Sequence, residues 1–118
     1  MKAESSTLTP FTKRVLTIIN QIPIGHVMAY GQVAAAAGNP RAARQVARIL
    51  HSMSDKYQLP WHRVLNKTGK ISLRGEAATR QRRLLEQEGI VINEQNQVKM
   101  AAYQYIPKEN AFDLGEYI

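Results

Sequence analysis

The junction Gly38-Asn39-Pro40 constrains the fold of this chain more than any other feature of its sequence. Residues 32–37, just before it, are rich in alanine, which has the strongest helix propensity. Gly38 is a typical helix stop, Asn39 a favourable N-cap, and Pro40 suits the first position of a new helix. The sequence therefore predicts helices over residues 32–37 and 41–53. So tight a junction suits a helix-turn-helix and an ordinary helical hairpin equally well.

The second predicted helix favours the helix-turn-helix. One of its faces is apolar and consists of Ala42, Val46, Ile49, Leu50 and Met53. Arg41, Arg44 and Arg48 are spaced i, i+3 and i+7, so they share another face. Three guanidinium groups on one side repel each other unless an anion is near, and no acid precedes Asp55 to balance them. We interpret this face as one that binds a polyanion, the alternative being a solvated charged face.

The charge of the chain favours the same kind of partner. Its 118 residues carry 16 basic and 9 acidic side chains, a formal net charge of +7. Residues 107–118 hold one Lys and three acids, so the first 106 residues carry a net charge of +9. A basic body favours nucleic acid as the partner, although charge alone does not distinguish it from a merely soluble basic protein.

Shorter patterns predict the remaining elements. The spacing of apolar residues predicts a helix over 10–22 and another over 77–88, with Leu84 and Leu85 turned inward. Turn residues and short apolar runs predict a loop at 54–59, a short hairpin or turn over 64–73 in which 64–65 would pair with 70–73, and a terminal hairpin of 90–92 with 97–100. The predicted fold is therefore mainly α with a small β-hairpin element.

We expect a single domain over residues 1–118, with its core at about 10–106 and a tail at 107–118. The chain contains no cysteine, which excludes disulfides, thiolate metal sites and a cysteine nucleophile. Neither a targeting segment nor a membrane-spanning stretch is evident, so we expect no membrane association and a cytoplasmic location, nucleoid-associated in a bacterium. No cofactor or metal is expected, and we expect a monomer.

Five motifs in a set order carry a family resemblance. They are Ile22-Pro23-Ile24-Gly25-His26-Val27, Ala29-Tyr30-Gly31-Gln32-Val33-Ala34, Gly38-Asn39-Pro40-Arg41-Ala42-Ala43-Arg44-Gln45-Val46, Pro60-Trp61-His62-Arg63-Val64 and Leu84-Leu85-Glu86-Gln87-Glu88-Gly89. Each is weak alone, but the ordered set is highly specific and spans about residues 11–89. The chain resembles the O6-alkylguanine-DNA alkyltransferases, and within them the non-catalytic alkyltransferase-like proteins. The resemblance implies a winged helix-turn-helix-like DNA-binding domain.

Trp61 stands where the resembling family has its active-site cysteine, in the motif Pro-Cys-His-Arg-Val. In that family the cysteine takes the alkyl group from damaged guanine. An indole cannot become a thiolate, so the nucleophile is missing here. The resemblance implies a pocket that holds the flipped, alkylated base against an aromatic ring without reacting with it. A plain core tryptophan is the alternative.

The resemblance also implies roles in DNA binding. Arg44 matches an arginine that fills the space left by the flipped nucleotide, although a phosphate contact is the commoner role of such a residue. Tyr30 matches a tyrosine that promotes rotation of the nucleotide, with simple packing as the alternative. The family docks its recognition helix in the minor groove, where a small residue permits close approach. The residues expected to bind and flip DNA are Tyr30, Arg41, Ala42, Arg44 and Arg48.

Three further positions complete the expected pocket. His62 and Glu88 match the family's activating pair, and without a cysteine to deprotonate we expect them to form a structural hydrogen-bonded pair. Arg74 replaces a tyrosine and is expected to contact the purine, with solvent exposure as the alternative. Met53 replaces an asparagine that holds the active-site loop in the family. The expected lesion pocket comprises Pro60, Trp61, His62, Arg63, Val64, Arg74 and Glu88.

The resemblance thus implies a sensor that binds O6-alkylguanine in duplex DNA, flips it and flags it for nucleotide excision repair, whose proteins would be its partners. Two alternatives remain. A glycosylase or hydrolytic dealkylase using His62 and Glu88 would release a free base or an alcohol. A helix-turn-helix transcription regulator would prefer a defined DNA sequence over a lesion.

Overall fold

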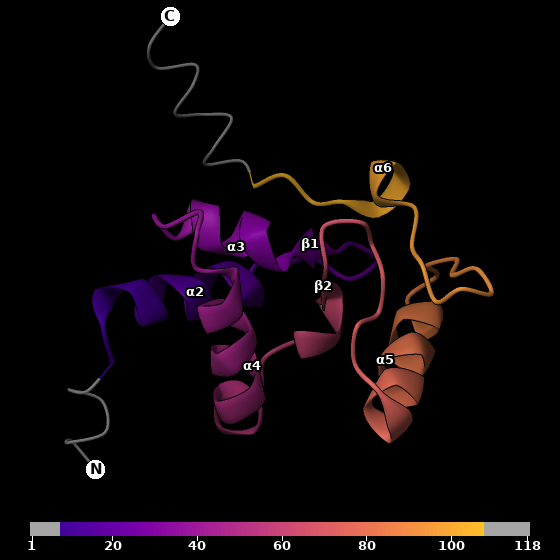
Figure 1. Cartoon of the computed structure of the whole chain (residues 1–118), viewed down its shortest axis with the longest axis horizontal. Coiled ribbons are helices and arrows are strands. Elements are labelled where there is room, and N and C mark those ends of the chain that lie inside the picture. Colours follow the sequence, from indigo (N-terminus) through magenta and orange to yellow (C-terminus); the bar gives the residue numbers. More distant parts are fainter. Residues whose placement is uncertain (1–7, 108–118) are drawn as a thin grey trace, which may run out of the picture.

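The computed structural model describes residues 8–107, so the predicted tail at 107–118 lies outside the described residues except for Pro107. In chain order the elements are α2 (Pro10–Asn20), β1 (Met28–Ala29), α3 (Tyr30–Ala36), α4 (Ala43–Tyr57), a 3-10 turn (Trp61–Arg63), β2 (Val64–Leu65), α5 (Gly75–Gln87) and α6 (Met100–Tyr103) (Figure 1). A mainly α-helical fold with a small β element is therefore confirmed. Within residues 8–107, no helix has the length and apolar character that a membrane span requires.

Helix α2 begins where the sequence predicts and ends two residues before the predicted end. Thr9 caps it, because the Thr9 hydroxyl accepts a hydrogen bond from the amide of Thr12 at 3.1 Å. Its buried face consists of Thr12, Val15, Leu16 and Ile19. The Arg14 guanidinium donates to the carbonyl of Ala37 at 2.7 Å, which ties α2 to the end of α3.

Helices α3 and α4 pack against each other across a short turn, in the predicted helix-turn-helix arrangement (Figure 1). Gly38 ends the first helix with φ +104°, a conformation that strains residues with a Cβ. The prediction that Asn39 caps the second helix is wrong. The Asn39 side chain accepts from the amide of Arg41 at 3.1 Å, and its carbonyl accepts from the amide of Ala42 at 3.0 Å. Pro40 and Arg41 therefore lie in an extra turn, and α4 begins only at Ala43.

Helix α4 is longer than predicted, so the expected loop at 54–59 is wrong over residues 54–57. The helix continues to Tyr57, and Gln58 ends it with φ +54°. Within this extension the Ser54 hydroxyl donates back to the Leu50 carbonyl at 2.6 Å, a common way for a serine inside a helix to satisfy its hydroxyl. The extension carries Ser54 and Asp55 towards the motif that follows.

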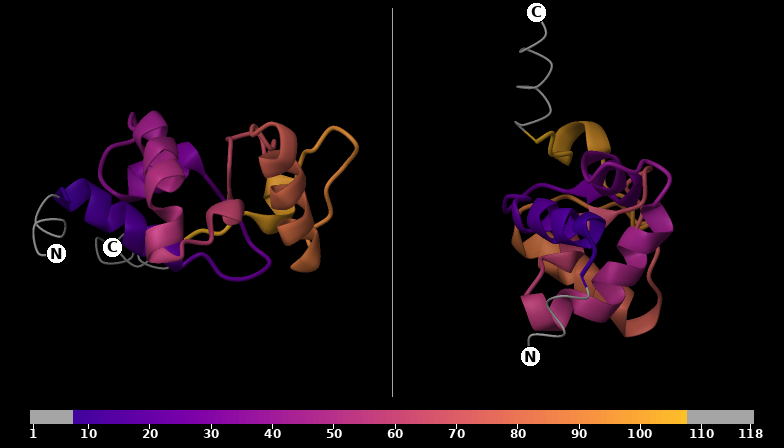
Figure 2. Two further views of the ribbon diagram at one scale, coloured as in Figure 1. Left: turned by 90° about the horizontal axis from the view of Figure 1, so that it is seen from below. Right: turned by 90° about the vertical axis from the view of Figure 1, so that its left-hand side faces the viewer.

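The two short strands pair in parallel and separate two apolar clusters. Met28 is aligned with Val64, and Ala29 with Leu65. Because successive strand residues face opposite ways, Met28 and Val64 belong to the cluster of α2, α3 and α4. Leu65 belongs to the second cluster, with Val27 and the apolar residues of α5 and the C-terminal segment. The ribbon shows α2, α3 and α4 on one side of the strands and α5 on the other (Figures 1 and 2).

Residues 64–65 and 70–73 do not pair as the two strands of the predicted hairpin. Both residues of β2 are buried, so they pair with the buried strand β1 instead. The turn at 66–69 is present, since the Gly69 amide donates to the Asn66 carbonyl at 2.9 Å, but Lys70 then bridges to Gln97. Gly69 has φ +84°, and a Cβ there would collide with the carbonyl of Val98. The turn and the C-terminal segment are therefore in close contact.

The C-terminal segment returns across both parts of the fold. The predicted terminal hairpin is reduced to one antiparallel bridge between Ile92 and Val98. The short helix α6, which the sequence did not indicate, follows it. After α6, the Tyr105 amide donates to the Val27 carbonyl at 2.8 Å, which places the chain beside β1. Helix α5 buries Leu85 completely and Leu84 partly, so the inward face predicted for it is present.

Candidate nucleic-acid interface

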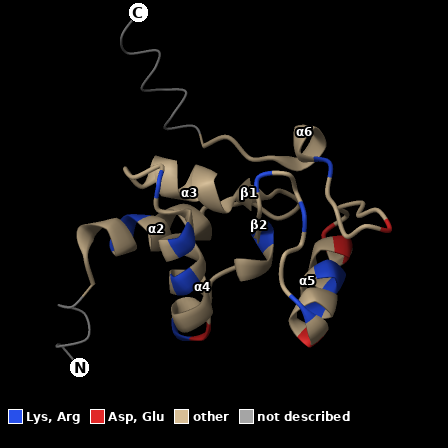
Figure 3. Ribbon diagram, viewed as in Figure 1, with Lys and Arg blue, Asp and Glu red and all other residues tan. Residues whose placement is uncertain are grey.

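A basic face lies on α4 and the turn before it. Arg41, Arg44 and Arg48 are all exposed, and no ion pair between residues 8–107 involves any of them. Figure 3 shows further Lys and Arg residues on α5, with the acids near the helix ends. This distribution leaves a positive surface without internal compensation, which suits a polyanionic partner.

Ala42 does not take the place expected for it. Its side chain is only 8% exposed and packs in the core cluster with Val46, one helical turn further on. The reason is that Ala42 precedes α4 on the apolar side of the helix, not on the arginine side. The Ala42 side chain therefore presents little surface to a partner. The exposed small residues of α4 are Ala47 and Ser52, which the sequence did not single out.

A cavity of about 290 Å³ lies between α4 and α5, close to the lower limit of about 300 Å³ for small-molecule sites. Its walls come from α3, α4, the 3-10 turn, the loop before α5, and α5 itself. The lining residues are Tyr30, Ala47, Leu50, His51, Ser54, Asp55, Trp61, Leu73, Ala77 and Arg80. Of the residues predicted to form the pocket or flip DNA, the structure brings Trp61 and Tyr30 to this cavity.

Trp61 forms part of the boundary between the core and the cavity. It opens the 3-10 turn after Pro60, is partly buried, and packs against the cluster of α2, α3 and α4. The ring of His62 meets it edge-on, with centroids 6.2 Å apart. The Arg80 guanidinium carbon lies 5.8 Å from the centroid of the indole, a cation–π distance. Trp61 is thus neither a plain core residue nor a free surface residue.

Several residues expected in the pocket do not line it. Val64 is fully buried because it forms β2, and its side chain faces the core. Arg74 is exposed and occupies the position before the first residue of α5. Pro60 sets the start of the 3-10 turn but is not part of the cavity wall. The sequence missed Arg80, because helical spacing relates it to Ala77 but does not show which face of α5 meets Trp61.

Glu88 connects the motif to the turn after α2, behind the cavity. Its carboxylate accepts hydrogen bonds from the Gly25 amide at 2.9 Å and from the Arg63 guanidinium at 2.8 to 3.1 Å. His62 Nε2 lies 2.7 Å from the same carboxylate. Arg63 also donates to the carbonyl of Ile22 at 2.9 Å. The expected contact between His62 and Glu88 is therefore present, within a larger network that holds the loop.

Glu88 is ionised at neutral pH. Burial raises its pKa, but the hydrogen bonds from Arg63, the Gly25 amide and His62 outweigh burial and lower the pKa to about 2. A carboxylate with so low a pKa accepts a proton poorly at neutral pH, so Glu88 itself is not a general base. Its carboxylate fixes the ring of His62 through the contact with Nε2, and His62 is not among the residues that line the cavity.

Gln81 holds the motif loop from the other side. Its side chain is 1% exposed, and its amide nitrogen donates to the carbonyls of His62 and Val64 at 3.1 and 3.2 Å. Its carbonyl oxygen is buried with no hydrogen-bond partner among residues 8–107. Met53 packs against the core and makes no such bond. Gln81, on α5, thus holds this loop, whereas Met53 contributes only to packing.

Tyr30 presents a neutral phenol to the cavity. It is the first residue of α3 and is partly buried against the core cluster. Burial raises the pKa of Tyr30 above its ordinary value of 10.0, and a hydrogen bond with Ser72 opposes this in part. At neutral pH the hydroxyl therefore keeps its proton and can donate a hydrogen bond at the edge of the cavity.

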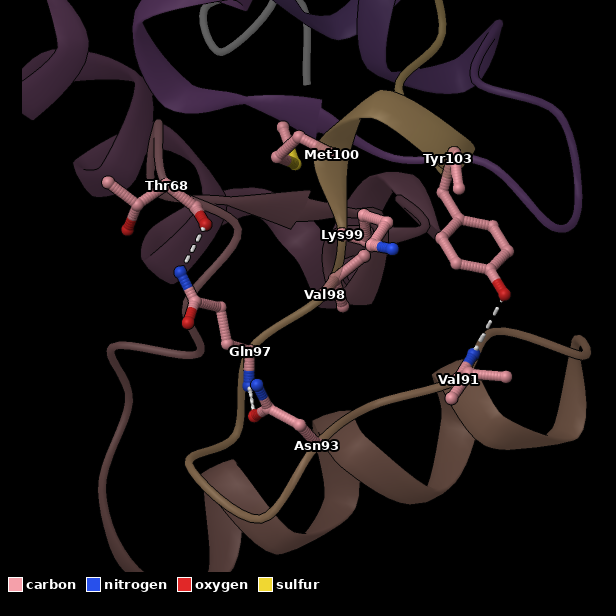
Figure 4. A pocket seen from close by; sticks show the side chains of 9 residues that line it. Thr68, Val91, Asn93, Gln97, Val98, Lys99, Met100 and Tyr103 are labelled. Atoms are coloured by element: carbon pink, nitrogen blue, oxygen red, sulfur yellow. Dashed lines mark hydrogen bonds between the residues drawn. The ribbon is translucent and has the colours of Figure 1, made fainter.

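A larger cavity, of about 650 Å³, lies away from the motif, between the C-terminal segment and the turn at 66–69 (Figure 4). Its polar groups are already engaged with each other. The Gln97 side chain donates to the carbonyl of Thr68 at 2.9 Å, and the Tyr103 hydroxyl accepts from the amide of Val91 at 3.2 Å. Because these bonds hold the segment together, we assign the hollow to the packing of the segment and place the functional site at Trp61.

Comparison with known proteins shows the family of this chain. The chain is 44% identical over 95 residues to the DNA base-flipping protein of Escherichia coli strain K12, covering 80% of this chain and 74% of that protein. It is 39% identical over 110 residues to Alkyltransferase-like protein 1 of Schizosaccharomyces pombe, covering 92% and 93%.

Solved structures give the same relationship. S. pombe Atl1, in complex with damaged DNA containing O6-carboxymethylguanine, matches with a TM-score of 0.75 and 33% identity, over 82% of this chain and 95% of that one. Mycobacterium tuberculosis OGT in complex with DNA matches with a TM-score of 0.60 and 34% identity, over 70% of this chain and 50% of that one. Residues 10–90 match the family described as 6-O-methylguanine DNA methyltransferase, DNA binding domain. This chain, with its helix-turn-helix and its Pro-Trp-His-Arg-Val loop, therefore belongs to this family and to its alkyltransferase-like branch.

Proposed function

We propose that this protein binds O6-alkylguanine in duplex DNA, rotates the damaged nucleotide into the cavity at Trp61, and holds it there without alkyl transfer. The observation that carries the proposal is that α4 contributes both the uncompensated arginine face and a wall of that cavity. Phosphate binding and base capture thus share one element. The names of the relatives support this, because they include a base-flipping protein and an Atl1 complex with alkylated DNA.

The absence of alkyl transfer is the first test. The chain has no cysteine, so it lacks the side chain that accepts the alkyl group in the resembling family. Incubation with duplex DNA carrying isotopically labelled O6-methylguanine should leave no label on the protein and should leave the lesion unchanged. Stoichiometric label on the protein would contradict the proposal. Release of free base or methanol would instead support the glycosylase or dealkylase.

The arginines of the α4 face should have two different functions, nucleotide flipping for Arg44 and phosphate contact for Arg41 and Arg48. Arg44→Ala is expected to abolish most of the signal from a flipping-sensitive fluorescent base placed beside the lesion. Arg41→Ala and Arg48→Ala serve as matched controls, and each should lower the magnitude of the salt slope of binding by about one unit while flipping persists. If Arg44→Ala weakens binding but leaves the fluorescence change intact, Arg44 contacts phosphate and does not enter the duplex.

We further propose that the bound complex flags the lesion for nucleotide excision repair. A pocket without a nucleophile leaves the alkylated base unchanged, so another activity must remove it. Excision of the damaged strand needs no chemistry at the O6 atom, which makes it compatible with a protein that only holds the base. Reconstituted excision on a single-lesion duplex should become faster when this protein is added, and Trp61→Ala should remove that gain.

A further inference from the structure

We propose that Arg80 makes the cavity selective for O6-alkyl adducts that carry a carboxylate. This inference rests on the proposed function and specifies the class of lesion that the site favours. Arg80 lies on α5, lines the cavity, and places its guanidinium carbon 5.8 Å from the centroid of the Trp61 ring. It therefore brings a positive charge to the residue that replaces the family's alkyl-accepting cysteine.

The substituent on O6 should point towards this charge. A cysteine that accepts the alkyl group must reach the first atom of that group, so the residue at position 61 adjoins the substituent of a bound lesion. The next atoms of the substituent then lie beside Trp61, in the cavity that Arg80 also lines. A planar guanidinium can donate two parallel hydrogen bonds to a carboxylate there.

Arg80 is available for such a contact. No ion pair between the described residues involves it. Its neighbour Arg82 differs, because Arg82 pairs with Glu86 at 3.1 Å and donates to the carbonyls of Ile92 and Asn93. Arg82 is thus engaged in holding the C-terminal segment, whereas Arg80 lies over the indole face of Trp61 and forms no ion pair within residues 8–107.

One acidic residue opposes this preference. Asp55, at the end of α4, lines the same cavity and is exposed, but it forms no ion pair with Arg80. Its negative charge should reduce the affinity for an anionic adduct. Asp55→Asn is therefore expected to increase the preference for the anionic adduct. Arg80→Gln should lower the same preference, so the two variants test one electrostatic effect in opposite directions.

The test compares two adducts of equal size that differ in charge. Duplexes of one sequence would carry guanine, O6-methylguanine, O6-carboxymethylguanine or its neutral amide, O6-carbamoylmethylguanine. The wild-type protein should bind the carboxymethyl duplex about fivefold more tightly than the carbamoylmethyl duplex, the upper range for a partly exposed ion pair. Arg80→Gln should remove this difference.

Arg83→Gln is the matched control, because Arg83 is also on α5 but does not line the cavity. It should weaken binding to all four duplexes alike and keep the preference. Equal affinity of the wild-type protein for the two equal-sized adducts, or an Arg80→Gln variant that keeps the preference, would overturn the inference. Failure to prefer any lesion over guanine would instead overturn the proposed function, so the two failures are distinguishable.

Discussion

Glu88→Ala is expected to lower the free energy of unfolding by about 1–3 kcal/mol, the usual cost of leaving hydrogen-bonding groups away from water without their partner. The carboxylate satisfies Arg63, His62 and the amide of Gly25, and its side chain is only 12% exposed. Denaturant titration would measure the loss. Glu86→Ala is the control, since Glu86 pairs with Arg82 at the surface and should change stability by about 0.5 kcal/mol or less.

The same carboxylate should make stability depend on pH in a defined window. The folded-state pKa of Glu88 is about 2, below its ordinary value of 4.5, so the stabilisation is complete above pH 4.5 and is lost as the pH falls towards 2. The Glu88→Gln variant has no carboxylate, so it lacks this pH-dependent contribution to the free energy of unfolding. The gap in unfolding free energy between wild type and Glu88→Gln should therefore be constant at neutral pH and shrink between pH 4.5 and 2. A gap that stays constant down to pH 2 would mean that the charge of Glu88 contributes nothing.

Trp61→Ala is expected to reduce binding to a lesion-containing duplex by about 1–3 kcal/mol, the value of stacking one base on an aromatic ring. Binding to undamaged DNA should change much less, because the phosphate contacts expected of Arg41 and Arg48 remain. Trp61→Phe keeps an aromatic ring and should retain most of the lesion preference. The measurement is the affinity of each variant for matched duplexes. An equal loss on both duplexes would show that Trp61 only supports the fold.

The elements that the sequence predicts well are those with local signals. Gly38 with its alanine-rich surroundings indicates the helix-turn-helix, and the pentapeptide indicates where Trp61 stands. The β1–β2 pair could not be predicted, because strands of two residues have no periodicity to reveal their partner. The start of α4 was misplaced because Asn39 forms hydrogen bonds within a turn in place of a helix cap.

The candidate site could be predicted only in part, because local signals in the sequence do not show how distant elements pack together. Trp61 and the contact of His62 with Glu88 follow from motif positions. Arg80 and Gln81 reach the motif from another helix, so their places depend on how α5 packs against the 3-10 turn. Ala42 and Val64 were assigned to DNA or lesion contact, but their small apolar side chains are part of the core. Motif spacing does not show on which side of the backbone each side chain lies.

The central claim is that this protein recognises a lesion and not a DNA sequence. Its most direct test is a titration of the wild-type protein against one duplex, synthesised with guanine or with O6-methylguanine at a single position. The account predicts tighter binding to the lesion duplex, and the same preference when the flanking sequence is changed. Equal affinity for the two duplexes, or a preference that follows the flanking sequence and ignores the methyl group, would contradict it.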